Sequence, residues 1–215
     1  MPSPNTSSPR ASVGSEGALR AVLIAPPGAG KGTQGRRMAE HYGVSYLSSG
    51  ELLRDEVARA TPTGTLIVEE LERGELVDDS IVSAVVFDNL SQADGGFVLD
   101  GFPRTVQQAR VTEHWTVDRG LPLDAAVELL VPREELVNRI RRRAVDTPRS
   151  DDALRTVLYR LDRYDQESND LLSFYRERGI LITVDGTGDV DEVTERIQNH
   201  IDRVLDPSKN NSEAR

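Results

Sequence analysis

Residues 25–33 read Ala25-Pro26-Pro27-Gly28-Ala29-Gly30-Lys31-Gly32-Thr33, a pattern typical of a loop between a strand and a helix. It follows a short apolar run, residues 21–24, and precedes a polar, helix-compatible segment, residues 34–42. A buried strand, a turn of small residues and a helix together form a cradle for phosphate. The glycines leave no side chain between the backbone N–H groups and an anion, and the lysine adds a mobile positive charge. The stretch therefore predicts a phosphate-binding loop; a glycine-rich connector that binds nothing is the alternative.

One position departs from the general phosphate-loop pattern G-x-x-x-x-G-K, because Ala25 stands where the pattern has its first glycine. The added Cβ atom can crowd the turn between strand and loop or restrict φ there. We expect the loop to persist, since its N–H donors come mainly from Gly28 onward. A lowered affinity for nucleotide is the expected cost if the methyl group disturbs the turn.

The composition restricts the class of protein. A chain of 215 residues suits one α/β domain with a sizeable core. The net charge of −10 argues against broad nucleic-acid binding, and the absence of cysteine excludes disulfides and thiolate metal sites. No apolar run reaches membrane length, and the first residues lack the apolar core of a signal peptide. We therefore expect a cytoplasmic enzyme without nucleic-acid or membrane partners.

Short apolar stretches alternate with helix-compatible stretches, which predicts an α/β fold with a parallel sheet covered on both faces. The expected strands are residues 20–25, 44–47, 97–99, 125–131 and 180–184. Residues 61–64 are expected to form a turn before a helix at 66–73, and the last two helices are expected at 151–178 and 190–205. Residues 1–17 are expected to be a disordered tail, residues 18–205 the domain, and residues 206–215 a second polar tail.

Ligands bind beyond the carboxyl ends of the strands in such a sheet. Three polar segments follow expected strands at such ends: the loop at 25–33, residues 100–104 and residues 185–188. Asp100 ends an apolar strand, a suitable place for a carboxylate that organises Mg²⁺ and its waters. An aspartate that caps a helix or closes a turn is the alternative for this residue.

Arginine outnumbers lysine in this chain, and several arginines stand at breaks between the expected elements. Planar guanidinium groups bind phosphate oxygens in pairs and remain charged. Phosphoryl transfer needs such groups, because its transition state spreads negative charge over the equatorial oxygens. For a single arginine an ordinary surface position is the alternative, except for Arg104, which follows a strand and a proline. The candidates are Arg54, Arg104, Arg139, Arg143, Arg149 and Arg160.

Four spaced motifs cover much of the chain and read Pro27-Gly28-Ala29-Gly30-Lys31-Gly32-Thr33-Gln34, Ser48-Ser49-Gly50-Glu51-Leu52-Leu53-Arg54, Gly74-Glu75-Leu76-Val77 and Asp100-Gly101-Phe102-Pro103-Arg104-Thr105. In this order they resemble the motifs of the adenylate kinases, and the similarity covers about residues 19–205. The resemblance implies a five-stranded parallel sheet with two mobile pieces. These are an AMP-binding segment at about 48–77 and a short lid at about 143–152, without the zinc site of long-lid members.

The resemblance also implies a role for each matching residue. The phosphates of ATP would bind Gly28, Ala29, Gly30, Lys31, Gly32, Thr33 and Arg143, with Arg139 and Gly188 near the adenine and Asp100 holding Mg²⁺ through water. AMP would bind Ser49, Arg54, Glu75, Leu76, Val77, Gly101, Phe102, Pro103, Arg104, Gln108, Arg149 and Arg160, with Gln108 at the adenine edge. The residues that act on the transferring group would be Lys31, Arg104, Arg143, Arg149 and Arg160.

The expected reaction is reversible transfer of a phosphoryl group from MgATP to AMP, giving two ADP, by a monomeric enzyme. Ser49 stands where the family usually has threonine, which leaves the strictness of AMP selection open. A kinase for UMP or CMP is therefore one alternative. A nucleotide sensor without catalysis is the other, and Ala25 is the residue that favours it.

Overall fold

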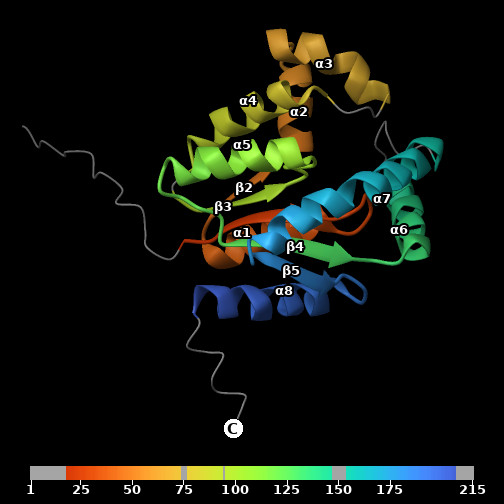
Figure 1. Ribbon diagram of the computed structural model, residues 1–215. Coiled ribbons are helices and arrows are strands. Elements are labelled where there is room, and N and C mark those ends of the chain that lie inside the picture. Colours follow the sequence, from red (N-terminus) through yellow and green to blue (C-terminus); the bar gives the residue numbers. More distant parts are fainter. Residues whose placement is uncertain (1–17, 74–76, 94, 147–153, 207–215) are drawn as a thin grey trace, which may run out of the picture.

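Five parallel strands form the centre of the protein, whose computed structural model describes residues 18–73, 77–93, 95–146 and 154–206 (Figure 1). The strands are β1 (Arg20–Ile24), β2 (Ser45–Ser48), β3 (Phe97–Asp100), β4 (Ala125–Leu130) and β5 (Leu181–Asp185). Their order in the sheet is β2-β3-β1-β4-β5, and every neighbouring pair is parallel. The five-stranded parallel sheet that the resemblance implied is confirmed.

Helices cover both faces of this sheet. They are α1 (Lys31–Tyr42), α2 (Ser49–Ala58), α3 (Pro62–Arg73), α4 (Asp79–Leu90), α5 (Val106–Val117), α6 (Arg133–Asp146), α7 (Leu154–Glu177) and α8 (Val190–Leu205). Figure 1 shows α4 and α5 on one side of the sheet and α8 on the other. Among the described helices, none combines a membrane-spanning length with the apolar character that a bilayer requires.

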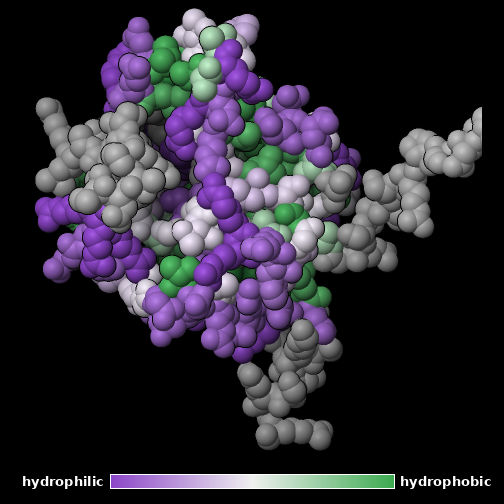
Figure 2. Space-filling model, turned by 180° about the vertical axis from the view of Figure 1, so that it is seen from behind, coloured by the Kyte–Doolittle hydropathy of each residue, from purple (hydrophilic) through white to green (hydrophobic). Residues whose placement is uncertain are grey.

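The alternation of side chains along the strands divides the core into two layers. Ala21 and Leu23 of β1 pack with buried residues of α1, α6 and α8, whereas Val22 and Ile24 pack with α4, α5 and the second half of α7. The strands are apolar on both faces because helices cover both, as expected for a parallel sheet. Figure 2 shows the molecule from behind, where hydrophilic residues cover most of the visible surface and hydrophobic residues appear in separate places.

The expected turn at residues 61–64 is wrong, because α3 already begins at Pro62. The Thr61 hydroxyl accepts a hydrogen bond from the Gly64 N–H at 3.0 Å, and proline is favoured at the first helical position. Gly64 serves close packing rather than a turn: a Cβ atom there would lie 2.0 Å from the Glu56 carbonyl oxygen in α2. The glycine therefore lets the backbones of α2 and α3 approach each other.

The order of the strands fixes where a ligand can bind. β1 continues through α1 to β2, whereas its neighbour β3 continues through α5 to β4, so these two connections run in opposite directions and open a crevice at the carboxyl ends of β1 and β3. The loop at 25–33 joins the end of β1 to α1, and residues 101–104 follow the end of β3. The fold thus brings two of the three polar segments to one place.

Candidate functional site

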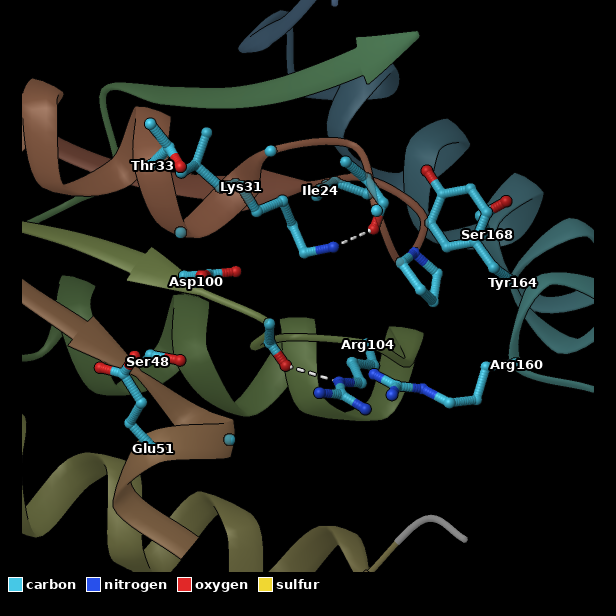
Figure 3. Close-up of a pocket in the computed structure, with 18 of the residues that line it drawn as sticks. Ile24, Lys31, Thr33, Ser48, Glu51, Asp100, Arg104, Arg160, Tyr164 and Ser168 are labelled. Atoms are coloured by element: carbon cyan, nitrogen blue, oxygen red, sulfur yellow. Dashed lines mark hydrogen bonds between the residues drawn. The ribbon is translucent and has the colours of Figure 1, made fainter. Parts of the chain in front are cut away.

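A cavity of about 420 Å³ opens at the carboxyl ends of β1 and β3 (Figure 3). Its lining comes from the phosphate loop, the start of α2, the segment after β3, α6 and α7. The structure brings twelve of the predicted site residues to this one cavity: Gly28, Gly30, Lys31, Gly32, Thr33, Arg54, Asp100, Gly101, Pro103, Arg104, Arg139 and Arg160.

The loop side of the cavity is built from backbone. Gly28 and Gly30 have φ angles of 85° and 93°, a region that favours glycine. Gly28 also packs tightly, because a Cβ atom there would lie 2.7 Å from the Ile140 side chain of α6. Gly30 is the N-cap of α1 and provides no side-chain cap, so the first N–H groups of the helix face the cavity as an anion site.

Lys31 lies across this loop. Its Nζ donates hydrogen bonds to the carbonyl oxygens of Ala25 at 2.5 Å and Pro26 at 3.0 Å (Figure 3). The positive charge is therefore held beside the anion site by the chain that forms the loop. A phosphate bound to the loop would meet both the N–H groups and this ammonium group.

The backbone at Ala25 has a conformation that alanine adopts without strain. Within the described residues, Ala60 is the one non-glycine residue with a positive φ angle, so the backbone at Ala25 does not require glycine. The methyl group is buried in the core with Leu23 and Ala29. Ala25 also lines the cavity, so it lies where this hydrophobic layer meets the loop.

The opposite side of the cavity is built from arginine side chains. The Gly101 carbonyl oxygen accepts hydrogen bonds from Ser49 Oγ at 2.8 Å and from Arg104 Nε at 2.7 Å. This contact fixes the Arg104 guanidinium at the edge of the cavity, next to the segment that follows β3 and near Arg160 of α7 (Figure 3). Gly101 itself has a φ angle of 73°, so a residue with a side chain would strain the turn.

Positive charges gather around Arg104. Arg104 is exposed toward the open cavity, although protein atoms surround its guanidinium group. This burial, and then the charge of Arg160 and Arg54, lowers the pKa of the Arg104 guanidinium, while Asp100 opposes the shift. The guanidinium remains charged because its ordinary pKa is so high. Like charges held together favour a bound polyanion such as a chain of phosphates.

Asp100 provides the carboxylate of the site. It closes β3, is 7% exposed, and accepts a hydrogen bond from Tyr46 Oη at 2.7 Å through Oδ2. Burial and then the charge of Asp100 raise the pKa of Tyr46, so its hydroxyl stays protonated. Figure 3 shows Asp100 in the same cavity as Lys31 and Thr33. Among the described residues, no group of three or more His, Asp or Glu side chains is arranged to hold a metal ion alone.

Six of the other predicted residues do not line the cavity. Ala29, Val77 and Phe102 are buried in the core, while Ser49 supports the Gly101 carbonyl group. Gln108 is 3% exposed and its amide is already bonded: Oε1 accepts from the Arg104 N–H at 2.7 Å, and Nε2 donates to Asp79 at 2.7 Å. The last residue of this group is Gly188.

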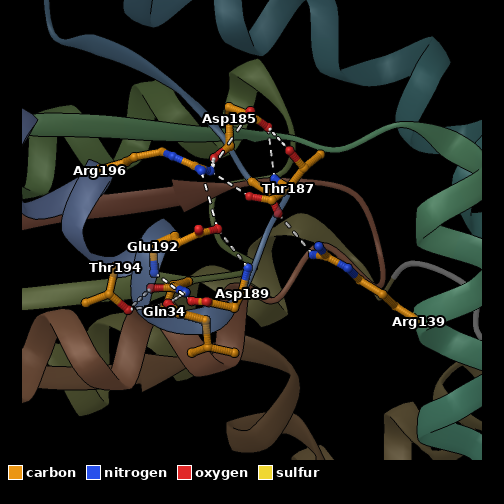
Figure 4. Close-up of polar contacts among 10 residues, drawn as sticks. Gln34, Arg139, Asp185, Thr187, Asp189, Glu192, Thr194 and Arg196 are labelled. Atoms are coloured by element: carbon orange, nitrogen blue, oxygen red, sulfur yellow. Dashed lines mark hydrogen bonds and ion pairs between the residues drawn. The ribbon is translucent and has the colours of Figure 1, made fainter.

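Gly188 lies in the loop between β5 and α8, which arginines hold from two sides (Figure 4). Arg139 of α6 donates to the Gly186 carbonyl oxygen at 3.1 Å, and Arg196 of α8 donates to the Thr187 carbonyl oxygen at 2.6 Å. Gly188 has a φ angle of 96°. Arg139, which also lines the cavity, therefore joins the phosphate site to this loop.

Several predicted residues lie outside the described part of the chain. Glu75, Leu76 and Arg149 belong to these, as do residues 1–17 and 207–215 of the expected tails and residues 147–152 of the expected lid. For Arg143 the structure describes the helix but not the side chain.

Sequence reasoning missed part of the lining. The missed residues include Arg36, Tyr46, Glu51, Arg163, Tyr164, Glu167 and Ser168. Those on α7 follow Arg160 at helical spacing, so they share its face. That spacing was visible in the sequence and was the signal that would have found them. Arg163 and Glu167 form a hydrogen-bonded pair at 2.6 Å on this face.

Comparisons with known proteins agree with this geometry. The family model described as adenylate kinase matches residues 23–180. The chain is 43% identical to an adenylate kinase of Xanthomonas euvesicatoria pv. vesicatoria over 187 residues, which cover 86% of this chain and all of the relative. It is 42% identical to an adenylate kinase of Micrococcus luteus over 180 residues, which cover 83% of this chain and 88% of the relative. The chain therefore belongs to the adenylate kinase family.

Proposed function

We propose that this protein transfers the γ-phosphoryl group of ATP to AMP, reversibly, and so forms two ADP. One observation carries the proposal: an arginine cluster and a backbone anion site face each other across a single cavity. Two nucleotides bound on these two sides would meet at their phosphates. An AMP phosphate oxygen attacks the γ-phosphorus of ATP, the bond from that phosphorus to the β-phosphate oxygen breaks, and ADP leaves.

Each side of the cavity has its own task in this proposal. The loop at 28–33 binds the phosphates of ATP, and Lys31 stabilises charge on the transferring group. Arg104 and Arg160 bind equatorial oxygens and position AMP, so that much of the rate enhancement comes from orientation. Val77, Ser49 and the segment 101–104 complete the AMP side. Arg139 and Gly188 lie near the adenine of ATP.

Gln108 is proposed to read the adenine edge of AMP. Its Oε1 and Nε2 atoms each form one hydrogen bond, to Arg104 and to Asp79, and each atom can form a second one to a base. Both sites of the amide would then recognise the base, which has a donor and an acceptor next to each other.

Two segments are proposed to close over the nucleotides. The AMP-binding segment is residues 48–77, and the lid is residues 143–152, from which Arg143 and Arg149 would reach the phosphates. Closure excludes water, so ATP reacts with AMP and is not simply hydrolysed. We also propose that the enzyme works as a monomer in the cytoplasm, without nucleic-acid or membrane partners.

The donor set of the cavity fits Mg²⁺. Asp100 offers a buried carboxylate and Thr33 a hydroxyl group, and oxygen atoms are the ligands that this ion prefers. We propose that Asp100 holds Mg²⁺ through water and that the Thr33 hydroxyl contacts it. The ion would supply neutralisation of the negative charge on the phosphates of ATP.

A coupled assay with four acceptors tests the proposal. The enzyme is given MgATP with AMP, UMP, CMP or GMP, and kcat/KM is compared. We expect AMP to exceed the others by at least about a hundredfold, because a site that hydrogen-bonds one base rejects others strongly. A preference for UMP or CMP would replace the acceptor in the proposal. Nucleotide binding without turnover with any acceptor would favour the sensor.

A further inference from the structure

Tyr46 occupies a central place under the cavity although no motif contains it. It stands in β2, and its hydroxyl donates to Asp100 Oδ2 at 2.7 Å. Its ring packs on α1 at Gly35, where a Cβ atom would lie 2.5 Å from the ring. The Arg36 guanidinium covers the ring at 4.7 Å from its centre.

Arg36 in turn fixes this arrangement from the cavity side. It donates to the Gly32 carbonyl oxygen at 3.2 Å and forms an ion pair with Glu51 of α2 at 2.5 Å. The tyrosine ring is thus enclosed by α1 beneath and a guanidinium above. Its hydroxyl group therefore has a defined position beside Asp100.

We propose that Tyr46 is a positioning residue that orients the Asp100 carboxylate toward the Mg²⁺ of the bound nucleotide. This rests on the proposed role of Asp100. The terminal torsion of an aspartate is broad, so a carboxylate at the edge of a cavity can rotate. A hydrogen bond to Oδ2 selects one orientation and leaves the other oxygen for a water molecule of the ion. Residues that hydrogen-bond to a metal ligand orient that ligand and so affect the affinity for the metal ion.

The chain contains a matched control. Tyr42 also donates its hydroxyl hydrogen to an aspartate, Asp202 Oδ1, at 2.9 Å. This pair joins α1 to α8, and neither residue lines the cavity. Tyr42→Phe and Tyr46→Phe therefore remove the same group from the same kind of contact, but only the second touches Asp100.

The experiment measures affinity for a bisubstrate inhibitor, two adenosines joined by five phosphates, with Mg²⁺ and with a chelator instead. The readout is the ratio of the two dissociation constants, determined by calorimetry on the full chain. We expect Tyr46→Phe to reduce the gain in affinity from Mg²⁺ by about tenfold, the lower end for a partner of a metal ligand, with metal-free binding unchanged. Tyr42→Phe should leave the ratio unchanged.

Asp100→Asn separates the inference from the role on which it rests. If Asp100→Asn leaves the Mg²⁺ ratio unchanged, the proposed metal role of Asp100 fails and the inference fails with it. If Asp100→Asn reduces the ratio but Tyr46→Phe does not, the positioning role of Tyr46 alone is overturned. Equal reductions in Tyr46→Phe and Tyr42→Phe would also overturn it, because the effect would then be one of general stability.

Discussion

The two sides of the cavity present different chemical groups to a ligand. On the loop side, backbone N–H groups and the folded-back Lys31 are fixed by β1, α1 and the packing of Gly28 on α6. On the other side, the guanidinium groups of Arg104, Arg160 and Arg54 converge although they repel each other. The first side is therefore held by contacts within the protein, whereas the second gathers like charges that a bound anion would offset.

This difference separates stability from catalysis. A change on the loop side disturbs the fold and the site together, because the same backbone serves both. A change on the arginine side removes binding while relieving repulsion in the protein without ligand. Substitutions on the two sides should therefore affect activity and stability differently.

Arg104→Ala is expected to lower kcat by on the order of 10²–10³, because a charged donor to the transferring group is lost. In the protein without ligand, the midpoint of urea unfolding should stay the same or rise. The Gly101 carbonyl oxygen keeps its hydrogen bond from Ser49, so the turn remains supported. Steady-state kinetics and urea titration measure the two effects. Arg141→Ala, an exposed position on α6, is the control and should change neither. A clear loss of stability in Arg104→Ala would contradict the contrast.

Gly30→Ala tests the loop side. The left-handed conformation strains alanine by about 1–2 kcal/mol, and the new methyl group enters the anion site. We expect the Kd for ATP to rise at least tenfold. Gly43→Ala is the matched control, since Gly43 caps α1 with a φ angle of 63° and, as at Gly30, no described atom lies within 4 Å of the added Cβ. Both variants should lose similar stability, but Gly43→Ala should bind ATP normally. Equal affinities would show that the methyl group does not reach the ligand.

Ala25→Gly should have the smallest effect on binding. Because the methyl group is buried in the core and the backbone does not need glycine, the Kd for ATP should stay within about twofold. The free energy of unfolding should fall by about 1 kcal/mol through lost burial and added chain entropy. Calorimetry and urea unfolding measure the two quantities. A large gain in affinity would instead mean that Ala25 distorts the loop.

Much of the fold could be predicted from local patterns. The strands are short apolar runs, and α8 begins and ends where its capping aspartate and apolar periodicity indicate. The turn expected at 61–64 failed because Gly64 reads as a loop residue. Its purpose, contact with the α2 backbone, exists only in the folded protein.

Candidate site residues that belong to a sequence motif were predicted. Contacts that form only between separate elements of the fold were missed. The loop glycines, Lys31 and Arg104 are consecutive with strand ends, so their place follows from topology. Tyr46 meets Asp100 only because β2 pairs with β3 in the register that places Ser48 beside Asp100. Gln108 was predicted as a site residue, but its hydrogen bond to Asp79 of another helix was not, because no local sequence pattern indicates that contact.

The close approach at Gly64 has a mechanical consequence. α2 and α3 are in backbone contact and are joined by only the residues 59–61. We therefore expect the two helices to move together as one rigid unit. Closing over AMP would then be a rigid-body rotation of the helix pair rather than the bending of a flexible segment. Substitutions at the ends of this unit could then change its motion without altering the packing of α2 on α3.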